Sequence, residues 1–189
     1  QLRGVFHLAL ELSDGAVINQ SEETLERVFS AKWRGAWNLH RMTQGMSLDH
    51  FVAFSSVLAV LGGAGQGNYT AACTAVDELI AQRRAIGQPG ISIHWGPWAY
   101  DHSAGLKALD QPQQAFRSFS PIPEPHGFEL LGLLMSLGGP NAVVARWNQR
   151  EWKRLHGQAS EMLDLLVPEE RESRPGAMSW LKRMESAAT

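Results

Sequence analysis

Several features that define large classes of proteins are scarce or absent in this sequence. It contains one cysteine, so no disulfide can form within the chain and a reducing compartment such as the cytoplasm is expected. Lysine and arginine total 17 against 19 acidic residues, which leaves no basic excess to attract nucleic acid or an anionic membrane. No apolar run approaches the about 20 residues of a membrane span, and the N-terminus lacks the layout of a signal peptide.

The composition otherwise indicates one globular domain. The chain has 189 residues, of which 44% are hydrophobic and 19% charged. Apolar runs typical of buried strands alternate with segments of helical periodicity, which predicts an α/β fold with a parallel sheet. The expected strands are 4–9, 51–55, 91–95 and 142–145, and the expected helices are 22–45, 66–86 and 123–137.

The most informative stretch is residues 49–73. A short apolar strand ends on Ser55 and Ser56, a glycine-rich loop follows at 62–67, and Tyr69 opens the next helix. In open α/β sheets, ligands bind beyond the carboxyl ends of the strands. The serines and Tyr69 are therefore expected where chemistry would be done.

A dinucleotide fingerprint is also missing. The Gly-x-Gly-x-x-Gly turn should follow a first strand and open a helix, so that backbone amides meet the pyrophosphate. The glycines at 62–67 instead follow the serine strand, and no ribose-reading residue comes about 20 residues later. We therefore expect a doubly wound Rossmann fold of which this chain supplies the second half only. The missing N-terminal half would be a partner that covers the open edge of the first strand.

Three motifs carry a resemblance to a known family. They are Phe54-Ser55-Ser56, Gly65-Gln66-Gly67-Asn68-Tyr69 and His94-Trp95-Gly96-Pro97-Trp98. In this order and spacing they resemble the ketoreductase domain of modular polyketide synthases, and less closely that of animal fatty acid synthase. Both belong to the short-chain dehydrogenase/reductase superfamily. The resemblance covers roughly residues 1–150.

The resemblance implies a catalytic group. Tyr69 would donate the proton, Ser56 would polarise the carbonyl, and Lys32 would tune the tyrosine from the preceding helix, as in polyketide ketoreductases. A free tyrosine titrates near pH 10, and a nearby ammonium lowers that pKa. The family places an asparagine four residues after the tyrosine, where this chain has Cys73. A thiol is a weak hydrogen-bonding group, so we expect a slower proton relay.

Further roles follow from the same resemblance. The expected cofactor contacts are His7, Pro97 and Trp98, and the expected substrate or stereocontrol residues are Asp14, Leu61, Gln66 and Asn68. In the family, ketoreductases that give the B-type hydroxyl configuration carry a Leu-Asp-Asp triplet, and Asp14 matches its last residue. The opposite class has a tryptophan eight residues before the tyrosine, where this chain has Leu61. The resemblance therefore favours the B-type configuration. His7, His40 and His94 lack the spacing of metal ligands, so no metal site is expected.

The implied function is NADPH-dependent reduction of a β-ketoacyl thioester. The substrate would be held on the phosphopantetheine arm of an acyl carrier protein, beside other synthase domains. Residues 1–150 would form the catalytic part, with a lid at about 99–122 and a short helix near 103–110. Residues 151–189 would form a linker with a possible short helix at 177–186. Two alternatives stay open: α-ketoacyl reduction in a peptide-synthetase module, and a non-catalytic scaffold domain.

Overall fold

A parallel sheet of four strands carries the rest of the fold. The protein is represented by a computed structural model that describes residues 1–99, 116–148, 151, 152 and 154. The strand order is β1-β2-β3-β5, and every neighbouring pair is parallel. The strands are β1 (Gly4–His7), β2 (His50–Ser56), β3 (Ile91–Trp95) and β5 (Asn141–Val144). The predicted α/β fold with a parallel sheet is confirmed.

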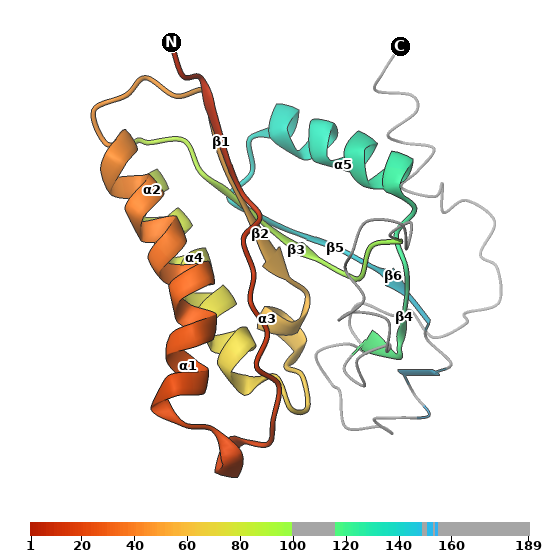
Figure 1. The fold of residues 1–189 in the computed structure, drawn as a ribbon. Coiled ribbons are helices and arrows are strands. Elements are labelled where there is room, and N and C mark those ends of the chain that lie inside the picture. Colours follow the sequence, from red (N-terminus) through yellow and green to blue (C-terminus); the bar gives the residue numbers. More distant parts are fainter. Residues whose placement is uncertain (100–115, 149–150, 153, 155–189) are drawn as a thin grey trace, which may run out of the picture.

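Helices cover both faces of this sheet. On one face lie α1 (Glu22–Phe29), α2 (Gly35–Thr43) and α4 (Gly67–Ala85), and on the other lies α5 (Glu124–Leu137) (Figure 1). The first face buries a core that includes Phe51, Val76 and Ile80. The second buries Val52 and Ile93 against the apolar side of α5. Because successive side chains of a strand point to opposite faces of the sheet, alternate strand residues pack against α1, α2 and α4 on one face and against α5 on the other.

Local signals account for the helix ends. Ser21 caps α1: its Oγ accepts from the Thr24 amide at 3.3 Å, while the Thr24 hydroxyl accepts from the Ser21 amide at 2.8 Å. At the other end of the fold, α5 stops at Gly138, whose φ of 63° is left-handed and favours glycine. These two boundaries follow directly from the sequence.

The predicted helix over 22–45 is interrupted. Residues Ser30–Arg34 form a π-helical turn between α1 and α2, here called the π turn. Buried side chains recur every four residues across it, at Val28, Lys32, Ala36 and His40. In a regular α-helix that spacing drifts by about 40° per step, and the wider π turn takes up part of the drift. The turn thus keeps Lys32 on the face that meets the sheet.

Short elements beyond those predicted also occur. They are a 3₁₀ turn at Val17–Asn19, the one-turn helix α3 (Leu58–Leu61), and the antiparallel pair β4 (Phe119–Ser120) and β6 (Arg146–Trp147). Trp152 packs with Phe119, Val57 and Leu58, so the core extends at least to that residue. The helices predicted at 103–110 and 177–186 lie outside the described residues.

One edge of the sheet has no further strand among the described residues. There β1 pairs with β2 alone, and the apolar side chains of Phe6, Leu8 and Leu10, on β1 and just beyond it, are 47%, 53% and 43% exposed. An exposed apolar strand edge is a site for pairing with a further strand. Among the described residues, no helix is long and apolar enough to cross a membrane.

Candidate active site

A buried lysine lies at the centre of the candidate site. The Lys32 side chain leaves the π turn, and the residue is only 2% exposed. Its ammonium donates to the Phe54 carbonyl at 2.5 Å and lies 5.8 Å from the centre of the Tyr69 ring. Burial is the main cause that lowers the pKa of Lys32, and negative charge at Cys73 or Asp77 would offset this effect only in part. The structure thus brings Lys32 and Tyr69, predicted from distant segments, into one cluster.

Cys73 completes this cluster from the same helix face as Tyr69. It is fully buried one turn after the tyrosine. Burial raises the pKa of the thiol, while the Lys32 charge and a hydrogen bond with the Tyr69 side chain lower it in part. Because the net shift is upward, Cys73 remains a neutral thiol at neutral pH. Cys73 therefore interacts with both the tyrosine and the lysine of the cluster.

The two serines at the end of β2 differ in direction. Ser56 is the last strand residue, and its Oγ accepts from the Leu58 amide at 3.2 Å where α3 begins. Ser55 lies on the helix side and makes a weak contact with the Cys73 thiol. In the described part of the chain, its buried hydroxyl has no closer hydrogen-bond partner. The sequence placed both serines at this end of the strand but assigned a role only to Ser56, although strand alternation indicates that Ser55 is the one that faces α4.

Asp14, Gln66 and Asn68 join two loops beside Tyr69. The Gln66 amide donates to Asp14 Oδ2 at 3.0 Å, and the Asn68 amide donates to the Ser13 carbonyl at 2.8 Å. The Gly15 amide adds a backbone bond to the Gly65 carbonyl at 2.7 Å. Burial raises the pKa of Asp14, and its bond to Gln66 lowers it in part. The loop after β1 is therefore fixed against the start of α4.

His7 supports the backbone of the lysine. Its Nε2 atom donates to the Lys32 carbonyl at 2.7 Å, and the ring packs against Gly35, where an added Cβ would come within 3.0 Å of it. Burial is the main cause that lowers the pKa of His7, so the ring is neutral at neutral pH. The residue predicted as a cofactor contact thus also anchors the π turn.

The remaining predicted residues lie at the rim. Pro97 and Trp98 follow β3, and the Pro97 carbonyl accepts from the Ile122 amide at 2.7 Å. The Trp98 ring packs on Trp95 at 4.8 Å and on Phe128 of α5 at 5.6 Å between ring centres. Leu61 ends α3 and packs on the cluster around Leu58. None of these three residues contacts the lysine cluster through a side-chain hydrogen bond in the described part of the chain.

A second polar group lies one turn beyond Cys73, and the sequence did not single it out. Asp77 accepts from the Ser92 hydroxyl at 2.5 Å and from His94 Nε2 at 2.9 Å. The signal was present, because Asp77 continues the helix face of Tyr69 and Cys73. Ser92 and His94 share one face of β3. No set of three metal-ligating side chains gathers among the described residues.

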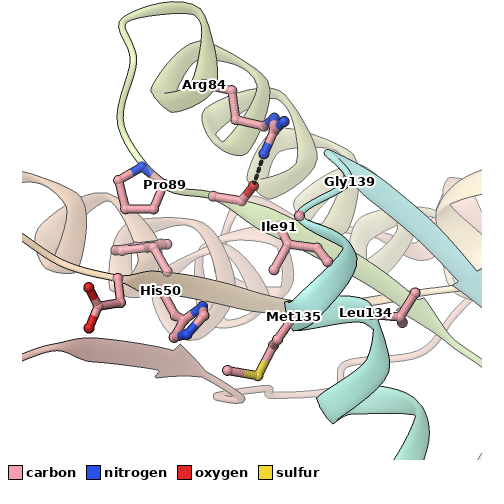
Figure 2. A pocket seen from close by; sticks show the side chains of 11 residues that line it. His50, Arg84, Pro89, Ile91, Leu134, Met135 and Gly139 are labelled. Atoms are coloured by element: carbon pink, nitrogen blue, oxygen red, sulfur yellow. Dashed lines mark hydrogen bonds between the residues drawn. The ribbon is translucent and has the colours of Figure 1, made fainter. Parts of the chain in front are cut away.

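A pocket of about 110 Å³ lies at the opposite end of the sheet (Figure 2). Its walls include His50 at the start of β2, Ile91 at the start of β3, and Leu134 and Met135 near the end of α5. Arg84 donates to the Gly90 carbonyl at its rim at 3.1 Å. Since this pocket is at the amino ends of the strands, it is separate from the candidate site at their carboxyl ends.

Fold and site together define an α/β domain of the Rossmann type with a lysine and a tyrosine at the carboxyl ends of its strands. The family model described as "KR domain" matches residues 1–100. The chain therefore belongs to the ketoreductase domain family of polyketide synthases, within the short-chain dehydrogenase/reductase superfamily.

Relatives agree with this family. The chain is 46% identical over 99 residues to a phenolphthiocerol/phthiocerol polyketide synthase of Mycobacterium tuberculosis, covering 52% of this chain and 4% of that protein. It is 35% identical over 176 residues to polyketide synthase GfsB of Streptomyces halstedii, covering 92% of this chain and 3% of that protein. The chain thus spans only a small part of the relatives that it matches.

Solved ketoreductases share the fold. One described as the first ketoreductase of the tylosin polyketide synthase has a TM-score of 0.64 at 32% identity, covering 88% of this chain and 35% of that one. One described as an A1-type ketoreductase has a TM-score of 0.71 at 25% identity, covering all of this chain and 37% of that one. One described as a C2-type ketoreductase has a TM-score of 0.66 at 28% identity, covering 80% of this chain and 32% of that one, so ketoreductases described as different types share this fold.

Proposed function

We propose that this chain carries the catalytic residues of an NADPH-dependent ketoreductase that acts on a β-ketoacyl group. The substrate would be a thioester on the phosphopantetheine arm of an acyl carrier protein. The observation that carries the proposal is the buried Lys32 ammonium, 5.8 Å from the Tyr69 ring at the carboxyl ends of the strands. The family and the synthases among its relatives support the same function.

The residues divide the reaction between them. The bound nicotinamide would supply a hydride to the carbonyl carbon. As the C=O π bond opens, its oxygen takes the proton of the Tyr69 hydroxyl and becomes the product hydroxyl. Ser56 would hydrogen-bond the same oxygen, and the Lys32 charge would stabilise the tyrosinate left behind. The tyrosine then regains its proton from solvent.

The lysine cluster fits a nicotinamide nucleotide. An ammonium has three N–H donors, and among the described residues one of them is used, by the Phe54 carbonyl. The other two are available for ribose hydroxyls beside the tyrosine. His7 would hold the Lys32 backbone in place, and Pro97 and Trp98 would border the nicotinamide at the end of β3. Selection of NADPH over NADH is part of the proposal.

Cys73 is expected to slow the reaction rather than abolish it. A neutral buried thiol neither holds a relay water well nor supplies charge to Lys32. Reprotonation of Tyr69 should therefore be slower than in an enzyme whose asparagine amide holds the relay water. A non-catalytic scaffold is the competing function, and the same observation favours it.

The partners follow from the open edge of β1. We propose that the N-terminal half of the ketoreductase, which would bring the pyrophosphate-binding turn, pairs along Phe6 and covers it. The acyl carrier protein and further synthase domains would complete the assembly. Such an enzyme would work in the cytoplasm, where a free thiol such as Cys73 persists.

Substrate orientation would depend on the joined loops. One side of the substrate would be lined by Asp14, which Gln66 holds in place, and by the neighbouring Asn68. Leu61 would leave this side open to the substrate, whereas a bulkier side chain at that position would block it. We propose the B-type hydroxyl configuration on this basis. Chiral analysis of the product tests it, and the opposite configuration would overturn it.

The test is NADPH oxidation by the intact polypeptide with a β-ketoacyl thioester. Turnover should be lost in Tyr69→Phe and raised in Cys73→Asn, while Glu78→Gln, an exposed change on the same helix, should leave it unaltered. An α-ketoacyl thioester run in parallel decides the substrate class. No turnover in any variant, together with no NADPH binding, would establish the scaffold function instead.

A further inference from the structure

The side-chain amide of Gln20 holds the backbone on both sides of Asp14. Its Nε2 atom donates to the Gly15 carbonyl at 3.2 Å and to the Ser13 carbonyl at 3.4 Å. A Cβ added at Gly15 would come within 3.1 Å of the same nitrogen, so the amide and the loop backbone are in close contact. Gln20 thus fixes the shape of residues 13–15, here called the Asp14 loop.

The oxygen of the same amide contacts the starts of two helices. Gln20 Oε1 accepts from the Thr24 hydroxyl at 2.9 Å and from the Asn68 amide at 3.0 Å. Thr24 lies in the first turn of α1 and takes part in its cap, and Asn68 lies in the first turn of α4. A side-chain amide has two N–H donors and an oxygen with two lone pairs, so these four contacts use its whole hydrogen-bonding capacity. One half-buried side chain therefore joins the Asp14 loop to both helices.

Asn68 connects this arrangement to the candidate site. It is only 3% exposed, and its Oδ1 atom accepts from the backbone amide of Tyr69 at 2.7 Å. Its Nδ2 atom donates to the Ser13 carbonyl at 2.8 Å as well as to Gln20. Gln20 and Asn68 thus bind each other and the same carbonyl of the Asp14 loop. The backbone of that loop is therefore fixed relative to the residue that precedes Tyr69.

We propose that Gln20 is a positioning residue that fixes the Asp14 loop beside Tyr69 and thereby determines how the acyl chain is oriented for reduction. The four hydrogen bonds that the structure gives its side chain go to the loop, to Thr24 and to Asn68, so its effect on the reaction passes through those groups. The hydrogen bonds are a property of the fold. The effect on substrate orientation rests on the proposed reductase function.

The first test needs no turnover. In the intact polypeptide, hydrogen–deuterium exchange around Gly15 reports the junction of the two loops, because the Gly15 amide donates to the Gly65 carbonyl at 2.7 Å. Gln20→Leu removes all four contacts, and Gln20→Glu replaces the two donors with an oxygen that faces two carbonyls. Each change should lower protection there about ten-fold at constant pH. Asn19→Asp makes the same change of amide to carboxylate at the exposed neighbouring residue and should leave protection unaltered.

The pattern of exchange along the chain decides the outcome. A fall in protection limited to the Asp14 loop and the starts of α1 and α4 would support the proposal. Parent-like protection in both Gln20 variants, or an equal fall in Asn19→Asp, would overturn it. A uniform fall that includes peptides of β2 and β3 would also overturn it, because Gln20 would then support the whole fold rather than the loop.

The second test uses the reaction. In Gln20→Leu, the KM for a β-ketoacyl thioester should rise about ten-fold and the share of the minor hydroxyl configuration should increase, while the KM for NADPH stays within about two-fold of the parent value. Initial rates and chiral analysis of the product measure these effects. A lower kcat with unchanged KM and unchanged configuration would overturn the role in orientation. If the parent has no turnover, the reductase proposal fails, whereas the exchange comparison still decides whether Gln20 holds the loop.

Discussion

At the scale of single residues, buried charge determines how the site responds to pH. Lys32 and Arg83 are both almost fully buried, and each rests on neutral acceptors at hydrogen-bond distance. Arg83 donates to the Pro89 carbonyl and to His40 Nδ1 at 2.8 Å, and its guanidinium stacks 3.9 Å above the Phe51 ring. After burial, the charges of Lys32 and Arg83 lower the pKa values of His7 and His40 further, so both rings are neutral at neutral pH.

His40 should make the fold sensitive to acid. Burial, followed by the Arg83 charge, lowers its pKa below 6.5, so the unfolded chain binds a proton more readily than the folded one. Stability is then full above pH about 6.5 and is lost as pH falls through the lowered pKa. We expect the protection factors of amides in α2 and α4, measured by hydrogen–deuterium exchange and corrected for the intrinsic exchange rate at each pH, to fall from pH 7.5 to 5.5, and to fall much less in His40→Gln. An unchanged pH dependence in the variant would contradict this origin.

His94 should act in the opposite sense. Its folded pKa is raised by Asp77, so its contribution is full below the unfolded pKa of about 6.5 and is lost as pH rises through the folded value. His94→Gln should therefore lower the local stability of β3 and α4 more at pH 6 than at pH 9. Hydrogen–deuterium exchange of the variant and the parent, compared at each pH, measures this difference. His126, an exposed histidine on α5, provides the control substitution.

At the scale of elements, α5 depends on one close approach. A Cβ at Gly127 would overlap the Trp98 ring, which lies between α5 and the sheet. We expect Gly127→Ala to destabilise the fold by about 1–3 kcal/mol, as overpacking does. Gly132 lies on the same helix with open space around it, so Gly132→Ala should instead stabilise it by about 0.5–1 kcal/mol. Thermal denaturation should therefore give a lower melting temperature than the parent for Gly127→Ala and a higher one for Gly132→Ala. Equal shifts in the two variants would contradict the packing argument.

Elements also show what the sequence could foretell. Strand β3 was predicted at its observed bounds, because Gly96 and Pro97 end the strand pattern of residues 91–95. The π turn was not, since side-chain periodicity alone does not distinguish it from a continuous helix. The lysine and the tyrosine were found through motif resemblance. The pairing of Asp77 with His94 was not predicted, because it joins a helix to a strand and has no local sequence signature.

At the scale of the whole molecule, the open edge of β1 limits independent stability. Phe6, Leu8 and Leu10 expose apolar surface at a strand edge that pairs with no further strand in the part of the chain that the structure describes. We expect residues 1–150 expressed alone to self-associate and to melt without cooperativity, as measured by light scattering and calorimetry. Phe6→Lys should reduce the association. A monomer with a sharp transition would contradict this expectation.

The π turn has a consequence for the register of the chain. Removing one residue from Ser30–Arg34 would convert it to regular helix and keep every hydrogen bond of α2. Because a π turn holds one residue more than an α turn, the segments on its two sides would keep nearly the same relative rotation after this deletion. Val28 before the turn and Ala36 and His40 after it would therefore stay on the buried face. A deletion within the regular helix α2, in contrast, would rotate the residues on its two sides by about 100° relative to each other and expose part of that face. We therefore expect the fold to tolerate the loss of one residue inside the π turn far better than the same loss inside α2.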